Sequence, residues 1–392
     1  MAYFSSSSQV GAPQLSGTVG ALKTVLKTLL VDGFGAASVQ SITVTGGQAV
    51  VAFASAHPYI VNGPIQIEGA TPAALNGIKT VRAATAQTVT FAAPGVADTT
   101  ATGASAKVPA AGWQELYAGT PNVLVLKPGA VGATGHVLRL DDTADISARA
   151  VGYEDMSDAA TGVGPVPTAA QMAGGLYWWK AIAASGPAPY LLFADAQGFH
   201  LFIDHRNGGT YVSQWCGDLR PSKSGDAWAW LLTGNTAQSQ PNSWPIPAAC
   251  NAYGGRTARA GAYLSRDFSG VPGAVQAQRI GRGQNGTATD AYSGSANYSM
   301  AGAGPNASNV AIELCQVELH TSDGGLRGVI PGMYHARNNW LSAAPENGQV
   351  FPGAGPLAGR RLMALRCSPS YWGNPDTAKG VVFMDLTGPW ER

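Results

Sequence analysis

The segment at residues 22–53, LKTVLKTLLVDGFGAASVQSITVTGGQAVVAF, changes from a helical to a β pattern over a short distance. Its first part contains one apolar stripe at helical spacing, formed by Leu22, Val25, Leu26, Leu29 and Leu30. Gly33, directly after Asp32, predicts the end of this helix. From residue 39 the apolar residues alternate with polar ones around a Gly-Gly turn, as in a β-hairpin. The helix therefore needs a partner surface, and the hairpin is not the only candidate.

Short alternating segments bounded by Gly, Pro or Asn continue to residue 108, which predicts a small all-β module over residues 39–108. The next segment, AGWQELY at residues 111–117, has the aromatic-rich composition of the later chain. We therefore predict that the module is inserted into a larger domain, because insertions are tolerated where the interrupted ends lie close together at the surface. The helix is then expected to pack on strands that follow Gly112.

The rest of the chain consists of short strand-like segments separated by turn residues. The predicted fold class is mainly β (α+β): an antiparallel β domain with one N-terminal amphipathic helix and an inserted small all-β module. We expect an N-terminal arm at 1–17 and a main β-rich domain made of 18–38 and 109–392, with a candidate division near residue 250. Residues 281–309 are rich in Gly, Ser and Asn and predict a long surface loop.

Composition and charge exclude several classes of protein. Charged residues make up 12% of the chain, about half the usual share, and the net charge is +1. No global field would attract nucleic acid or an anionic membrane surface, so we expect no nucleic-acid partner. No apolar run is long enough to predict a membrane span. The first residues lack the basic and apolar regions of a signal peptide, so we expect synthesis in the cytoplasm of the cell that makes the protein.

The four cysteines, Cys216, Cys250, Cys315 and Cys367, are far apart and form no CxxC pair. Zinc sites need close pairs of ligands, so no metal is expected. Two alternatives remain for the thiols: buried free cysteines, or disulfides that form after cell lysis. The chain also has no P-loop, no dinucleotide-binding glycine motif, no GxSxG and no HExxH. We therefore predict no cofactor, no catalytic residues and no enzymatic activity.

Six acidic residues lie within residues 141–158: Asp141, Asp142, Asp145, Glu154, Asp155 and Asp158. One hypothesis is a glycosidase site, which needs two carboxyl groups about 5–10 Å apart across a sugar. The other is a solvated hairpin turn followed by a polar loop. The spacing does not favour catalysis, and it also lacks the pattern of a calcium-binding loop, so we interpret the group as a turn and loop.

Two further groups have side chains that could perform chemistry or bind a ligand. His200, Asp204 and His205 could bind a metal or exchange protons, but we interpret them as polar residues of a half-exposed strand. The second group is aromatic and could build a core, contact a protein or present a carbohydrate platform, of which we favour the first two. It consists of Trp178, Trp179, Trp215, Trp228, Trp230 and Trp244.

Several segments together resemble a group of tailed-bacteriophage virion structural proteins. These segments are IEGATPAALNGIKTV at 67–81, LRLDDTADISARAVGYEDM at 138–156, LRGVIPGMYHARNN at 326–339, GRRLMALR at 359–366 and VVFMDLTGPW at 381–390. The resemblance spans most of the chain, and its motifs are packing and turn patterns. It implies a virion protein of the tail, assembled in the host bacterial cytoplasm. The module is also similar to small β domains of phage tail and fibre proteins.

The resemblance implies three hypotheses about function. The first is a non-enzymatic structural component of the tail tip, baseplate or short-tail fibre, with other virion proteins and copies of itself as partners. Residues 1–17 and 281–309 would then make inter-subunit contacts, and the module would face outward. The second is a tail protein that binds a host-surface receptor or glycan through exposed Trp and Tyr residues. The third is a tail-borne polysaccharide depolymerase that uses the carboxylates at 141–158.

Overall fold

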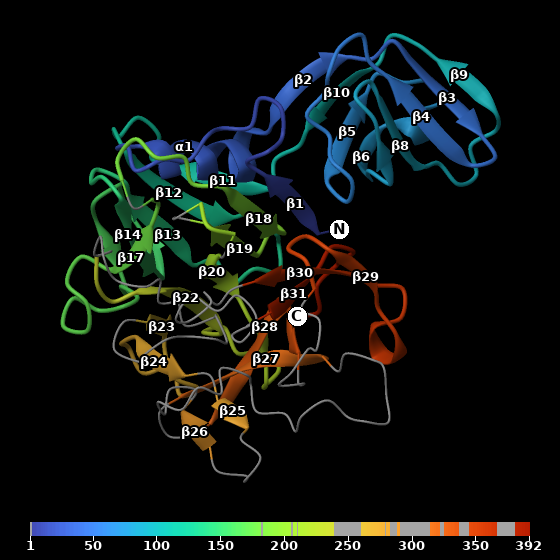
Figure 1. The fold of residues 1–392 in the computed structure, drawn as a ribbon. Coiled ribbons are helices and arrows are strands. Elements are labelled where there is room, and N and C mark those ends of the chain that lie inside the picture. Colours follow the sequence, from blue (N-terminus) through green and yellow to red (C-terminus); the bar gives the residue numbers. More distant parts are fainter. Residues whose placement is uncertain are drawn as a thin grey trace.

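The computed structural model describes residues 2–181, 183–204, 207–209, 211–238, 260–278, 280–282, 288–290, 314–321, 325–336, 345–366 and 381–392. The structure is mainly β, at 45% strand and 6% helix, and its sheets are antiparallel. The predicted fold class is therefore confirmed. Figure 1 shows a larger β-rich domain with a smaller module at one corner, reached through β2 and β10.

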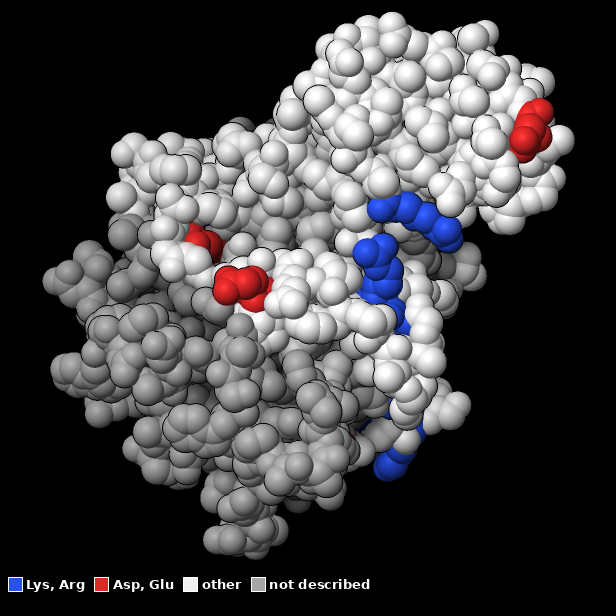
Figure 2. Space-filling model, turned by 45° about the vertical axis from the view of Figure 1, so that its right-hand side comes forward, with Lys and Arg blue, Asp and Glu red and all other residues white. Residues whose placement is uncertain are grey.

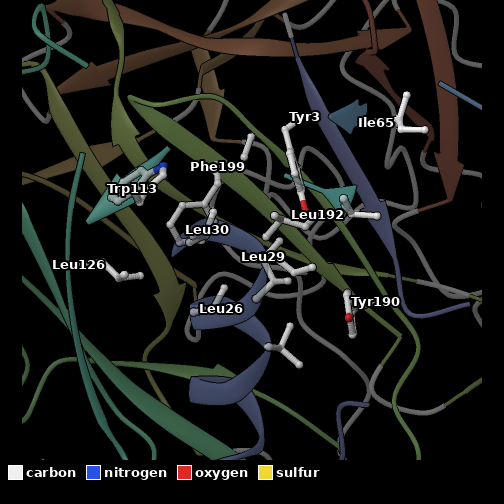
Figure 3. Close-up of a cluster of buried hydrophobic side chains, with 14 of the residues drawn as sticks. Tyr3, Leu26, Leu29, Leu30, Ile65, Trp113, Leu126, Tyr190, Leu192 and Phe199 are labelled. Carbon is white, nitrogen blue, oxygen red and sulfur yellow. The ribbon is translucent and has the colours of Figure 1, made fainter. Parts of the chain in front are cut away.

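The apolar stripe is buried on one face of a single helix. This helix, α1 (Ala21–Lys27), continues as a π-helical turn, η1 (Thr28–Asp32), and ends at Gly33. Leu26, Leu29 and Leu30 lie in one buried cluster with Trp113, Leu126, Leu192 and Phe199 of the main domain (Figure 3). The predicted packing of the helix on strands after Gly112 is confirmed.

The π-helical turn has a local cause in the return of the chain from the module. The amide of Gly33 donates to the carbonyl of Thr28 at 2.7 Å, one residue further back than in an α-helix. The carbonyl of Leu29 then accepts a hydrogen bond from the amide of Ala111 at 3.0 Å. The widened turn therefore joins the end of the helix to the segment where the main domain resumes.

A long antiparallel run of strands surrounds the helix stripe. Pairing proceeds from β11 through β12, β13, β14, β17, β22, β20, β19 and β18 to β1. The run consists of β1 (Tyr3–Ser6), β11 (Trp113–Leu116), β12 (Val123–Pro128), β13 (Val137–Asp141), β14 (Ser147–Tyr153), β17 (Leu176–Trp179), β18 (Tyr190–Ala194), β19 (Gly198–Ile203), β20 (Val212–Asp218) and β22 (Trp230–Asn235).

A second layer covers the opposite face of β18, β19, β20 and β22. Phe193, Phe202 and Trp215 on that face pack against apolar residues of the later strands. The residues of β19, β20 and β22 are all buried, because these strands are covered on both faces. The later strands are β23 (Ala260–Leu264), β24 (Val275–Gln278), β27 (Leu314–Thr321), β28 (Leu326–Ala336), β29 (Val350–Pro352), β30 (Arg361–Arg366) and β31 (Val381–Asp385). Five further strands in the described part are short: β15 (Asp155–Met156), which pairs with β16 (Gly162–Val163), β21 (Arg220–Pro221), which pairs with β28, and β25 (Ile280–Arg282), which pairs with β26 (Ala288–Asp290).

The module consists of two small sheets whose inward residues form its core. The alternation predicted for the first hairpin is present, since Ile42, Val44, Ala49 and Val51 are buried. One sheet has the order β2 (Phe34–Ser38), β10 (Ser105–Val108), β5 (Pro64–Glu68) and β6 (Gly77–Thr80). The other has the order β7 (Ala83–Ala84), β8 (Thr88–Ala92), β4 (Gln48–Ala52), β3 (Ser41–Thr45) and β9 (Thr99–Ala101).

The structure places two boundaries differently from the predicted division at 1–17, 18–38 and 39–108. Residues 34–38 form β2 and pair with β10 of the module, so the chain enters the module at Gly33. Residues 3–6 form β1, which pairs with β18 of the main domain, and Phe4 stacks on Phe193 at 5.0 Å. Both strands are short and rich in small residues, so neither shows a clear apolar alternation. The segment near residue 250, and 281–309 apart from parts of β25 and β26, lie outside the described residues.

The close approach at Gly33 gives a testable expectation. A Cβ built on Gly33 would lie 2.5 Å from the carbonyl oxygen of Val108, and Gly33 has φ +76°. Gly95 has the same φ but no atom within 4 Å of such a Cβ. We expect Gly95→Ala to cost about 1 kcal/mol of unfolding free energy for the backbone alone, and Gly33→Ala about 2 kcal/mol or more. Urea denaturation of both variants measures the difference, and equal losses would contradict the close approach.

Candidate functional site

Asp142 and Lys180 form an ion pair in the interior of the main domain. The Lys180 ammonium lies 2.6 Å from Oδ1 of Asp142, and both side chains are 0% exposed. Lys180 also donates to the carbonyls of Thr18 and Ala144, each at 2.8 Å. All three N–H bonds of the ammonium are therefore used. This geometry makes Lys180 a fixed internal cation.

Asp142 also holds the N-terminus of α1. Its Oδ2 accepts a hydrogen bond from the amide of Lys23 at 2.9 Å, and its backbone carbonyl accepts one from the amide of Gly20. Burial raises the pKa of Asp142, and the bonds from Lys180 and Lys23 act in the opposite direction. The helix lacks a side-chain cap of its own, so Asp142 supplies one from a distant part of the chain. Its carboxylate is inaccessible to a sugar.

The other acids at 141–158 have separate local partners. Asp141 accepts bonds from Arg139 and Thr143, and its pKa lies below the usual value although partial burial opposes this. Asp158 accepts bonds from the amides of Ala160 and Thr161, and these lower its pKa. Asp145 and Asp155 are exposed. The structure thus places these residues at strand ends and in turns, with partners that differ from those of Asp142.

Glu154 belongs to a layered cluster of charged and aromatic side chains. It accepts hydrogen bonds from Nε and a second guanidinium nitrogen of Arg266. That guanidinium lies over the ring of Trp228 at 3.9 Å. His136 stacks on Trp230 with ring centroids 5.4 Å apart and contacts Trp228 edge-on. The cluster joins the residue before β13, the residue after β14, the start of β22 and the segment after β23.

The electrostatics of this cluster point to a structural contact. Burial lowers the pKa of His136 to about 4, while Glu154 raises it and Arg266 lowers it further. Arg266 lowers the pKa of Glu154 and pairs with it directly. Because Arg266 lies over the ring of Trp228, that face of the indole is unavailable to a sugar.

His200 and Asp204 are buried and have different partners. Nε2 of His200 lies 2.8 Å from the carbonyl of Pro331, and its ring contacts Trp215 and Trp390. Burial lowers the pKa of His200 to about 3, so the ring is neutral at pH 7. Asp204 accepts hydrogen bonds from the amides of Gly208 and Gly209. Our prediction of a half-exposed strand was wrong for these two residues. Later strands cover His200 on β19, whereas Asp204 follows β19 and is bound by the turn at Gly208 and Gly209. His205 lies outside the described residues.

The tryptophans belong to the core. Trp178, Trp179, Trp215 and Trp230 are at most 1% exposed, and Trp228 is partly buried beneath Arg266. Nε1 of Trp178 donates to the carbonyl of Thr233 at 2.7 Å. The preferred interpretation of these residues as core is confirmed for the four buried ones. Trp244 lies outside the described residues.

The described residues contain one cysteine whose side chain is placed, Cys216. Cys216 is a buried free cysteine, and burial raises the pKa of its thiol. Cys250, Cys367 and the side chain of Cys315 lie outside the described part of the chain, so both alternatives stay open for them. Within the described residues, no three His, Cys, Asp or Glu side chains are grouped as a metal site would require. The helices in the described part are too short or too polar to cross a bilayer.

Sequence reasoning missed two buried cations, Lys180 and Arg327. Arg327 is 0% exposed, pairs with Asp226 at 2.9 Å and lies over the ring of Phe268. The position of Lys180 directly after two tryptophans was the available signal for its burial. A comparison with known protein families gives no match, and a comparison with curated proteins gives none either.

Proposed function

We propose that this chain is a non-enzymatic structural component of a tailed-bacteriophage virion. Its place would be the tail, as part of the tail tip, baseplate or short-tail fibre. Its partners would be copies of itself and other virion proteins. The sequence segments that resemble virion structural proteins suggest the class, and the surface chemistry of the module supports it.

The observation that best supports this proposal is the scarcity of charge on the module. Residues 34–108 contain five charged residues: Glu68, Lys79, Arg82, Asp98 and Lys107. In Figure 2 most of the module surface that faces the viewer is neither acidic nor basic. Exposed positions on its sheets include Val50 and Ile78, which are 40% and 49% exposed.

Such a surface is suited to contact with other proteins. The cores of protein interfaces are depleted in charged residues, whereas an isolated domain normally maintains charge for solubility. A subunit whose module is covered by neighbours in a particle does not need that charge. The module would then be an assembly contact, in addition to or in place of the outward-facing role expected from the sequence.

The other two hypotheses lose some of the residues on which they rested. Four of the six tryptophans suggested as a glycan platform are buried, and a guanidinium covers the face of a fifth. Asp142, one of the carboxylates at 141–158 suggested for a depolymerase, is enclosed by Lys180 and the helix N-terminus. We therefore put forward only the structural role.

Mass spectrometry of purified phage particles, with the copies of each protein counted, is the direct test. We expect several copies of this chain per particle, in a stoichiometry set by the symmetry of the tail. A chain that is abundant in the infected cell but missing from purified particles would refute the proposal.

A surface variant tests the assembly role of the module. We expect Val50→Lys with Ile78→Lys to change the unfolding free energy of the isolated chain by about 0.5 kcal/mol or less. Incorporation into particles should fall by about tenfold or more, because a charge would be buried without a partner. Val131→Lys on the main domain, where Val131 is fully exposed, is the matched control. Equal incorporation of both variants would show that the module surface is not an assembly contact.

A further inference from the structure

The module is attached through two chain segments that touch each other. The carbonyl of Val108, at the exit, lies against Gly33, at the entry. The entry contains Gly33 at φ +76°, and the exit, residues 109–110, runs from β10 to Ala111, whose amide is bonded to Leu29 of the main domain. A few residues at the ends of elements can absorb the change in φ and ψ that a hinge requires, and these two connections are short and adjacent.

Strand pairing does not fix the orientation of the module. In the described part of the chain, β2 to β10 pair only with one another, and the strands of the main domain form a separate sheet. Contacts outside the strand ladders must therefore set the angle between the two parts.

The N-terminal segment, residues 2–9, supplies such contacts. On one side β1 pairs with β18, and the amide of Ser7 donates to the carbonyl of Tyr190 at 3.0 Å. On the other side Nε2 of Gln9 donates to the carbonyl of Pro58 in the module at 2.8 Å. Tyr3 and Ile65 belong to one buried cluster, and Figure 3 shows Tyr3 on the side of the helix where Ile65 lies. The segment is therefore bound to both parts.

Gln9 is held in position for this contact. Its side-chain oxygen accepts hydrogen bonds from the hydroxyl of Ser5 at 2.6 Å and from the amide of Ser6 at 2.9 Å. The side chain is buried, and its remaining amide group faces Pro58. The N-terminal segment also passes close to the module at Gly63, where a Cβ would be 3.2 Å from the carbonyl oxygen of Phe4.

We propose that residues 2–9 are a strap that fixes the orientation of the module about a hinge at its two connections, Gly33 at the entry and residues 109–110 at the exit. While the strap is bound, module and main domain behave as one body. When its contacts to Pro58 and Gly63 are broken, the module turns about the two connections without loss of any strand pair. This device is independent of the role in a virion.

Hydrogen exchange on the full-length chain tests the strap. Gln9→Ala removes the bond to Pro58 together with the bonds from Ser5 and Ser6 that hold the side chain in place. We expect it to speed amide exchange at Gly63 and in residues 59–62 by about fivefold or more. Exchange within β13 and β14 should be unchanged. Gln14→Ala is the matched control, because Gln14 is exposed and bonds only to Ser7 and Ala12 of its own segment.

Small-angle scattering provides a second measurement on a chain that lacks residues 2–9. We expect a larger maximum dimension than for the full chain, with β content retained by circular dichroism. If that variant fails to fold, the comparison of hydrogen exchange between Gln9→Ala and Gln14→Ala tests the strap by itself. Unchanged exchange at Gly63 in Gln9→Ala, or an unchanged scattering curve of a folded deletion variant, would overturn the proposal.

Discussion

Replacing Lys180 with methionine is expected to lower the free energy of unfolding by about 3–5 kcal/mol. Methionine occupies a similar volume but removes the cation that lies 2.6 Å from Asp142. The carboxylate would then be buried without its ionic partner, and the N-terminus of α1 would depend on a destabilised cap. Chemical denaturation at pH 7 measures the loss.

Two further variants separate the charge effect from packing. Lys27→Met removes a half-exposed lysine of α1. This lysine pairs with Glu115 and Asp32 near the surface, so its loss should cost about 1 kcal/mol of unfolding free energy or less. Adding Asp142→Asn to Lys180→Met should recover part of the loss, because a neutral amide can still accept the bond from Lys23. A loss for Lys180→Met no larger than that for Lys27→Met would show that the buried pair contributes little.

Lowering the pH from 7 to 5 is expected to destabilise the protein by about 2 kcal/mol for each of His136 and His200. Burial lowers the pKa of His136 to about 4 and that of His200 to about 3, below the unfolded value of about 6.5. Between these values the unfolded chain binds more protons than the folded one, so stability falls as the pH falls. The loss begins near the unfolded pKa and continues down to the folded ones.

Denaturation curves at pH 7, 6 and 5 measure this slope. Burial raises the pKa of Asp142, Asp218 and Asp385, and these groups act in the opposite direction, with stability increasing as they take up protons. Since the usual pKa of aspartate is near 4, their effect is greatest toward the acidic end of the range. His200→Phe should remove about half of the slope between pH 7 and 5, although it also loses the bond to Pro331. A slope identical to that of the parent chain would show that His200 does not titrate on unfolding.

The parts of the fold that could be predicted are those with a regular apolar period. The stripe from Leu22 to Leu30 predicted both the helix and its burial, and the alternation after residue 39 predicted the hairpin of the module. In each case the residues that determine the pattern are neighbours in sequence, so the physical signal is local. The return of an aromatic-rich segment at Trp113 also located the surface on which the helix packs.

The features that could not be predicted depend on distant partners. Tyr3–Ser6 is a strand because β18 offers an edge and Phe193 a stacking surface, neither of which is visible near residue 3. The role of Asp142 depends on Lys180 and on the helix N-terminus, so its neighbours in sequence suggested a solvated turn. His200 is buried because strands from the last part of the chain cover β19. Nothing in the sequence near residue 200 shows that cover, so the strand was predicted to be half-exposed.

The contact between the entry and exit of the module affects how this chain can change over evolutionary time. Gly33, where the chain enters the module, lies against Val108, where the chain leaves it. On the main-domain side, the hydrogen bond from the Ala111 amide to the Leu29 carbonyl connects the flanking segments. A different domain could occupy this position without rethreading any strand of the larger sheet. The module can therefore be exchanged as a cassette, and the helix with its supporting strands can be inherited as a separate unit.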